Sequence, residues 1–70
     1  MKRRDLIRKI GKAAKGVGVD FDLEREGANH AIYRCGGQPV VIPRHNEINE
    51  LTAKGIMTDL EGELGAGWWK

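Results

Sequence analysis

Two histidines are the side chains of this chain best suited to move protons at neutral pH, because the ordinary pKa of an imidazole is about 6.5. His30 follows the turn-forming residues 27–29, and His45 follows Pro43 and Arg44. Both rings are therefore expected to reach solvent, where a histidine can act as general base or general acid. The guanidinium of Arg44 would help to hold a phosphate beside His45. Many surface histidines have no catalytic role, so the residues alone leave that alternative open.

A metal site and a cofactor are not indicated by the sequence. Two histidines without a carboxylate at a recognisable spacing do not form a specific ligand set, so we expect no metal. Cys35 is the single cysteine, which excludes an intramolecular disulfide and a multi-cysteine zinc site. Its simplest interpretation is a small strand residue in a reducing compartment.

The length and charge of the chain limit what kind of site it can build. Seventy residues form one domain, 1–70, without room for a second core or a large enclosed cavity, so an active site must be open. The net charge is only +2, but residues 1–15 carry seven basic side chains and one acidic one. This uneven distribution favours a polyanionic partner. No apolar run is long enough for a signal peptide or a membrane span, so we expect a cytoplasmic protein that binds no membrane.

Residues 3–15 are predicted to form an amphipathic helix that Gly16 and Gly18 end. Apolar side chains recur on one side of it at positions 6, 7, 10, 13, 14 and 17, and Arg4, Arg8, Lys12 and Lys15 line the opposite side. This basic stripe predicts contact with phosphates, and an ordinary solvated face is the alternative.

Three strands are predicted next, over residues 19–24, 30–35 and 38–42. Gly36 and Gly37 are typical of a tight hairpin, and Pro39 indicates an edge strand or the start of a strand. In the second strand, alternation puts residues 30, 32 and 34 on one face and residues 31, 33 and 35 on the other. Both faces carry an apolar residue, so the pattern leaves open which one is buried.

A second helix is predicted over residues 52–64, with Thr52 as a possible N-cap. Its apolar side chains at positions 53, 56, 57, 60 and 64 share one side. Together these elements predict an α+β fold with a two-layer α-β-β-β-α order, in which both helices cover one face of a three-stranded antiparallel sheet. The tail, 65–70, is either flexible, folded back on the domain, or placed against a partner through Trp68 and Trp69.

In the order and spacing of several short motifs, the whole chain resembles the HicA family, the RNA-cleaving toxins of HicA–HicB toxin–antitoxin pairs. Residues 2–7 resemble the family's basic helical opening, and residues 27–34 resemble its glycine–small–polar–histidine segment entering the second strand. Residues 40–45 resemble its third strand and Pro-Arg-His exit, and residues 52–56 resemble the lead into its final helix. Each motif alone is weak, but their combination within seventy residues is specific.

The resemblance implies a fold like a double-stranded-RNA-binding domain, metal-independent cleavage of mRNA, and neutralisation by a HicB antitoxin. His30 matches the family's catalytic histidine, which would transfer a proton while the 2′-hydroxyl attacks the adjacent phosphorus. His45 is the candidate for a second proton-transfer group. Cations are expected to stabilise the phosphate charge and to hold the RNA. The residues expected to contact RNA are Arg4, Arg8, Lys12, Arg34, Arg44, His45 and Lys54.

The chain departs from the family pattern in three places. Ala28 stands where the family often has serine, and Asn29 stands where many members have one of two successive histidines. The tail with its two tryptophans is not a family feature. Two other functions therefore remain open: a non-catalytic RNA-binding module of the same fold, and a protein-interaction domain.

Overall fold

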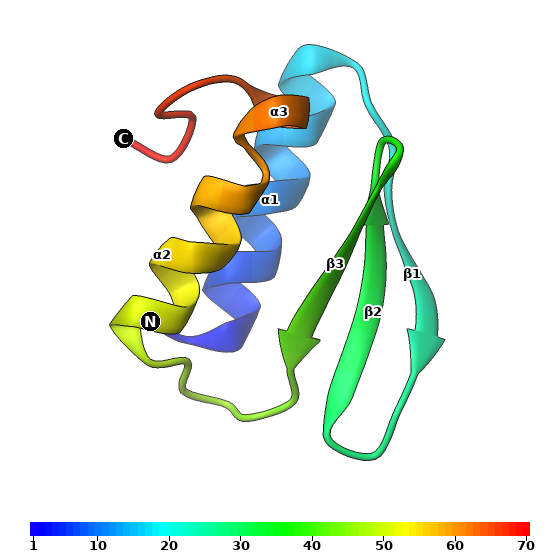
Figure 1. Cartoon of the computed structure of the whole chain (residues 1–70), viewed down its shortest axis with the longest axis vertical. Helices are drawn as coiled ribbons and strands as arrows, with labels where there is room; N and C mark the ends of the chain where they lie inside the picture. The colour runs from blue at the N-terminus through cyan, green and yellow to red at the C-terminus, as the bar shows by residue number, and fades with distance from the viewer.

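The computed structural model describes residues 1–70 and has two layers, a sheet and a set of helices that all lie on one side of it (Figure 1). The elements follow in the order α1 (Arg3–Val17), β1 (Phe21–Glu26), β2 (His30–Cys35), β3 (Gln38–Pro43), α2 (Glu50–Asp59) and α3 (Glu61–Leu64). The sheet is antiparallel with the order β1-β2-β3. The predicted α-β-β-β-α layout and the open sheet face are confirmed.

One hydrophobic core joins the two layers. Leu6 and Ile10 of α1, Ile42 of β3 and Leu60 are fully buried in it, and burying a side chain of this size stabilises a fold by about 1.5–3 kcal/mol. The complete cluster consists of Leu6, Ile10, Ala14, Cys35, Val40, Ile42, Ile48, Ala53, Ile56, Leu60 and Leu64. Every helix and the two strands β2 and β3 thus contribute to the same core.

Helix α1 is two residues longer than predicted. Gly16 lies inside it, and Gly18 ends it with φ 79°, donating its backbone N–H to the carbonyls of Ala14 and Lys15. Val17 was predicted on the buried side but is 53% exposed. The reason is visible in Figure 1, where the last turn of α1 extends beyond the end of the sheet and has no strand to pack on.

The predicted helix over residues 52–64 is wrong in its start and in its continuity. Asn49 is the N-cap, because its side-chain oxygen accepts hydrogen bonds from the N–H groups of Leu51 (2.8 Å) and Thr52 (3.4 Å). The helix is interrupted at Leu60, which has φ −90° and ψ 1° and whose side chain is completely buried. None of the three helices has the length and apolar composition that crossing a membrane requires.

The predicted bounds of the strands agree with the structure best at β2, where they are the same, and worst at β1. β1 begins and ends two residues later than predicted, and only Phe21 in it is partly buried, stacked on Tyr33 at 5.0 Å between ring centroids. Leu23, which shares with Phe21 the apolar side of the alternating residues 19–24, is 48% exposed because β1 is an edge of the sheet. Pro39 lies on the other edge strand, β3, as predicted.

The C-terminal tail folds back on α2. The indole N–H of Trp68 donates to the carbonyl of Met57 at 2.7 Å, and the backbone N–H of Gly67 donates to Oε2 of Glu61 at 2.7 Å. Trp68 also packs against the core, and the ring of Trp69 lies edge-to-face against the ring of Trp68. Of the three arrangements that the sequence left open, the structure therefore has the folded-back one.

Cys35 provides a test of this packing. Its side chain is fully buried, and burial raises the pKa of its thiol, with a smaller contribution from the Glu63 carboxylate. We expect Ellman's reagent to label Cys35 rapidly in urea and very slowly in the folded protein, because the exposed thiolate is the reactive form. Rapid labelling without urea would contradict the structure.

The same raised pKa sets a pH dependence for unfolding. The unfolded thiol ionises near its ordinary pKa of about 9 while the folded thiol stays neutral, so the contribution of Cys35 to stability is full below pH 9 and decreases above it. Urea unfolding at pH 8 and pH 10 should therefore show a larger loss for the wild type than for Cys35→Ala. Equal losses would mean that the thiol pKa is not raised.

Candidate functional site

The faces of the central strand β2 decide where His30 points. Ala31 and Cys35 are completely buried and face the helices. Because side chains alternate along a strand, His30 and Ile32 face the opposite, open side of the sheet. His30 is exposed there, at the first residue of the strand. The question that alternation left open is thus answered: the histidine lies on the uncovered face.

A β-bulge in β1 brings an arginine to the same face. Leu23 pairs with Tyr33, but the next pair is Arg25 with Ile32, so Glu24 is an extra residue without a partner. Cross-strand partners project from the same face, and Arg25 therefore joins Ile32 on the open side. Strict alternation would have placed it with Phe21 and Leu23, toward the helices.

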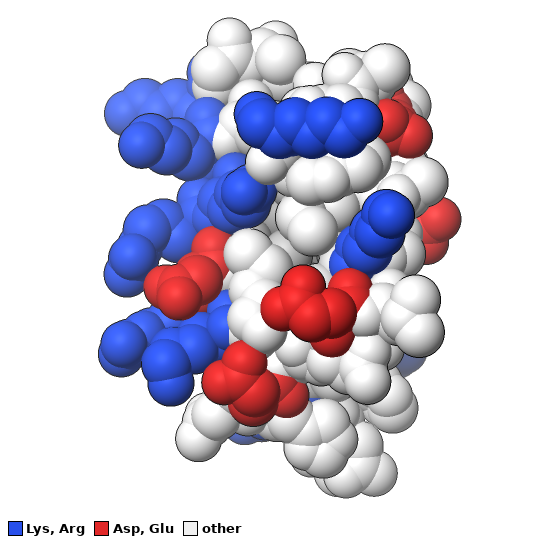
Figure 2. Space-filling view, turned by 90° about the vertical axis from the view of Figure 1, so that its left-hand side faces the viewer, with Lys and Arg blue, Asp and Glu red and all other residues white.

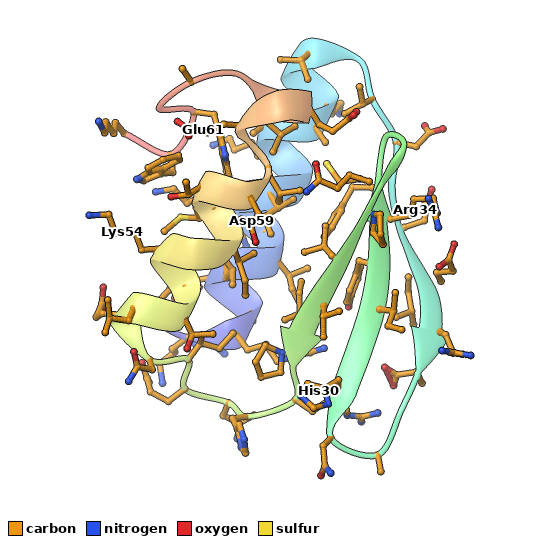
Figure 3. The ribbon with its side chains drawn as sticks, in the orientation of Figure 1. His30, Arg34, Lys54, Asp59 and Glu61 are labelled. Atoms are coloured by element: carbon orange, nitrogen blue, oxygen red, sulfur yellow. The ribbon has the colours of Figure 1, made fainter.

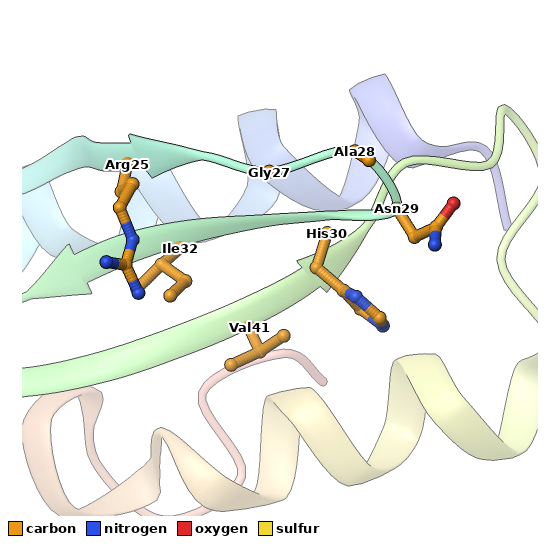
Figure 4. Close-up of a pocket in the computed structure, with 7 residues that line it drawn as sticks. All are labelled: Arg25, Gly27, Ala28, Asn29, His30, Ile32 and Val41. Carbon is orange, nitrogen blue, oxygen red and sulfur yellow. The ribbon is translucent and has the colours of Figure 1, made fainter.

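His30 and Arg25 line one open depression of about 430 Å³. Figure 4 shows them at its two ends, with Ile32 and Val41 between them. The two residues are diagonal neighbours across β1 and β2, a relation that separates Cα atoms by about 7–8 Å. The complete lining is Arg25, Gly27, Ala28, Asn29, His30, Ile32 and Val41.

The composition of this depression suits a nucleotide unit of a polymer. Arg25 forms no ion pair with a carboxylate of the chain, so its guanidinium is available to an external anion. The apolar floor can contact a base or a ribose, while the imidazole of His30 can exchange a proton with a hydroxyl or a phosphate oxygen. No group of three or more His, Cys, Asp or Glu side chains is arranged to hold a metal ion.

The turn that carries His30 is fixed by Arg44. The backbone N–H of Arg44 donates to the carbonyl of Asn29 at 3.1 Å. Its guanidinium donates to Oε2 of Glu26 at 2.7 Å and to the carbonyl of Gly27 at 3.2 Å. The N–H of Gly27 in turn donates to the carbonyl of His30 at 2.8 Å. Arg44, expected to contact RNA, thus uses its Nη1 group and its backbone N–H to hold the β1–β2 turn.

Arg34 is similarly engaged, but at the other end of β2. Its guanidinium donates to both carboxylate oxygens of Glu24, the closer at 2.7 Å, and to the carbonyl of Gly37 at 3.2 Å. The hydrogen bond from Arg34 lowers the pKa of Glu24. Figure 3 shows Arg34 and His30 toward opposite ends of the strand. At the usual rise of a strand, four residues separate their Cα atoms by about 13 Å. Arg34 therefore secures the bulge and does not line the depression.

The remaining expected RNA contacts lie on the helical layer. Arg4, Arg8 and Lys12 are exposed on the side of α1 opposite its buried residues. In Figure 2, basic side chains gather along the left-hand edge of the molecule. Lys54 projects from α2 away from the sheet (Figure 3). The helices separate these cations from the open sheet face, so the structure does not bring them together with His30.

His45 is exposed in the loop after β3 and does not line the depression. His45 comes two residues after Pro43, which is the cross-strand partner of His30. This connection limits the distance between the two histidine Cα atoms to about 13 Å. His45 thus lies at the same end of the sheet as His30.

Arg25 is the residue that reasoning from the sequence missed. The predicted strand ended at Glu24, and a regular strand would have turned Arg25 toward the helices. The run Glu24-Arg25-Glu26 held the indication, since regular alternation through it would turn the charged side chain of Arg25 to the apolar side of Phe21 and Leu23. A bulge resolves that conflict.

Gly27 offers a test of the turn with a matched control. A Cβ on Gly27 would lie 2.8 Å from the carbonyl oxygen of His30, whereas a Cβ on Gly55 meets open space in α2. We expect Gly27→Ala to lower the free energy of unfolding by about 1–3 kcal/mol and to shift the amide resonances of residues 27–30. Gly55→Ala should raise stability by up to about 1 kcal/mol. Equal stability of the two variants in urea would contradict the close contact.

The pairing of Glu24 with Arg34 predicts a pH dependence. Because the folded pKa of Glu24 lies below its ordinary value of about 4.5, the ion pair contributes fully above that pH and is lost as the pH falls through the lower folded value. Glu24→Gln should therefore be less stable than the wild type at pH 7, and the difference should shrink as the pH falls below 4.5. In an Arg34→Gln background the same change should have little effect at pH 7 or at the lower pH. A pH-independent difference would exclude this pair as its cause.

No family model, curated protein or solved structure matches this chain. The chemistry of the site is therefore derived from its own residues: an exposed histidine, an arginine without a carboxylate partner, and an apolar floor between them on an open sheet face.

Proposed function

We propose that this protein is an endoribonuclease that cleaves mRNA, and that it is the toxin of a HicA–HicB type toxin–antitoxin pair in the cytoplasm. The observation that supports the proposal best is the depression in which exposed His30 and unpaired Arg25 flank an apolar floor. The motif resemblance over residues 27–34 points to the same histidine. A small domain with an open site also suits a polymeric substrate.

The proposed reaction uses the 2′-hydroxyl of RNA as the nucleophile. The 2′-oxygen attacks the adjacent phosphorus, the bond from phosphorus to the 5′-oxygen breaks, and the products carry a 2′,3′-cyclic phosphate and a 5′-hydroxyl. His30 takes the proton of the 2′-hydroxyl or supplies one to the leaving 5′-oxygen. Arg25 stabilises the negative charge that builds on the non-bridging oxygens. Water or His45 completes the second proton transfer.

Neutralisation by a HicB-type antitoxin is part of the proposal and rests on the motif resemblance. The uncovered sheet face is compatible with it, because a protein seated over Ile32 and Val41 would block access to His30. Val41 is 52% exposed in the free chain, so its side chain is available to such a partner.

The enzymatic part is tested with purified protein and a labelled single-stranded RNA in the presence of EDTA. We expect the wild type to cleave it, and His30→Ala to lower kcat/KM by about 10²–10⁴-fold, the usual contribution of a general acid or base. Arg25→Gln should lower it by about 10²–10³-fold, while Lys70→Gln, the same loss of charge at the chain end, should not. If wild type and His30→Ala bind RNA equally and leave it intact, the chain is a non-catalytic RNA-binding module.

The toxin part is tested by growth. Induced expression of the wild-type chain should slow growth, His30→Ala should not, and co-expression of the neighbouring reading frame should restore growth and yield a co-purifying protein. Unimpaired growth with soluble wild-type protein would refute the toxin role even if the protein cleaves RNA in vitro.

A further inference from the structure

A second hollow of the molecule is lined almost entirely by positive charge. It measures about 320 Å³, and its lining consists of Lys2, Arg3, Arg4 and Asn46, with no apolar residue. None of these three cations forms an ion pair with a carboxylate. Glu47 lies close enough to Lys2 to sense its charge, but it is paired with the N-terminal ammonium at 2.8 Å. The hollow therefore presents three positively charged side chains that have no ion-pair partner.

These charges belong to side chains, and three nearby backbone N–H groups are already used. The N–H of Arg3 donates to Asn46, and those of Asp5 and Leu6 donate to Lys2. Cations in the first turn of a helix are unfavourable, because the helix macrodipole is positive at that end. Such a local conflict is typical of a functional site, and an anion bound in the hollow would relieve it.

Pro43 connects this hollow with the depression at His30. Nε of Arg3 donates to the carbonyl of Pro43 at 2.9 Å, and Pro43 is the cross-strand partner of His30. The exposed loop of residues 44–46 continues from Pro43 to Asn46 at the rim of the hollow. Both places thus lie at the end of the molecule where β2 begins, which is the lower end in Figure 1.

We propose that the hollow of Lys2, Arg3 and Arg4 is a second phosphate-binding site, occupied by the same RNA strand that is cleaved at His30. This inference rests on the proposed function. An RNA backbone that joins the open sheet face to the helical layer must turn round the end of β3. The molecule measures only 30 × 24 × 16 Å, and a nucleic-acid duplex is too stiff to bend so sharply. The substrate is therefore single-stranded RNA.

The test measures RNA binding in a His30→Ala background, which keeps the RNA intact. The probes are a fluorescein-labelled single-stranded decaribonucleotide and a hairpin with a ten-base-pair stem, titrated at several salt concentrations. We expect Lys2→Gln with Arg4→Gln to weaken binding of the single strand roughly tenfold and to reduce the salt slope by about 1.4, or about 0.7 for each lost phosphate contact. The control, Lys9→Gln with Lys70→Gln, removes equal charge outside the hollow and outside the basic stripe, and it should stay within about twofold.

Three outcomes would overturn this inference alone. Equal losses of affinity in the two double variants would mean long-range attraction without a site. An unchanged affinity of Lys2→Gln with Arg4→Gln would mean that the hollow is not used. Tighter binding of the hairpin than of the single strand would mean a duplex substrate. Cleavage of RNA by the wild type is measured in parallel. If the wild type neither binds nor cleaves RNA, the proposed function itself fails, and that result is distinct from all three.

Discussion

The burial of Ala31 and Cys35 against the helices is the constraint on which the site depends. β2 is the central strand, so its face assignment is imposed on both neighbours through the pairing register. A slip of one residue would turn both small buried side chains to solvent and carry His30 into the core. The hydrophobic core and the position of the histidine are thus two results of one register.

The carboxylates on either side of Arg25 fix the edge strand β1 through ion pairs with two other arginines. Glu24 pairs with Arg34, and Glu26 pairs with Arg44, each at 2.7 Å. Arg25 between them forms no ion pair with either carboxylate. The bulge leaves it on the open face of the sheet, together with Ile32. Of these three arginines, two thus stabilise local geometry and one is left available to a ligand. Arginine, which in a sequence suggests phosphate binding, therefore serves two different purposes here: it stabilises the turn and the bulge, and it is available to an external anion.

The sequence predicted the order of elements and the bounds of β2, because glycine pairs and periodic apolar residues are strong local patterns. It did not predict the bulge at Glu24, the cap at Asn49 or the break at Leu60. Each of these depends on what the residue meets in space: a paired strand with an offset register, two free N–H groups, and a core position. His30 was found through its turn and the motif around it. Arg25 was missed because a one-residue insertion in the pairing reverses which face a side chain occupies.

The prolines of β3 have a consequence for self-association. In an antiparallel pair closed by a two-residue turn, residues 39, 41 and 43 point their backbone N positions away from β2, toward the free edge. Two of these three are proline and have no hydrogen to donate. At the other edge, the bulge and successive charges of β1 oppose the addition of a flat strand. A sheet protected against aggregation at both edges can keep one face uncovered in a crowded cell.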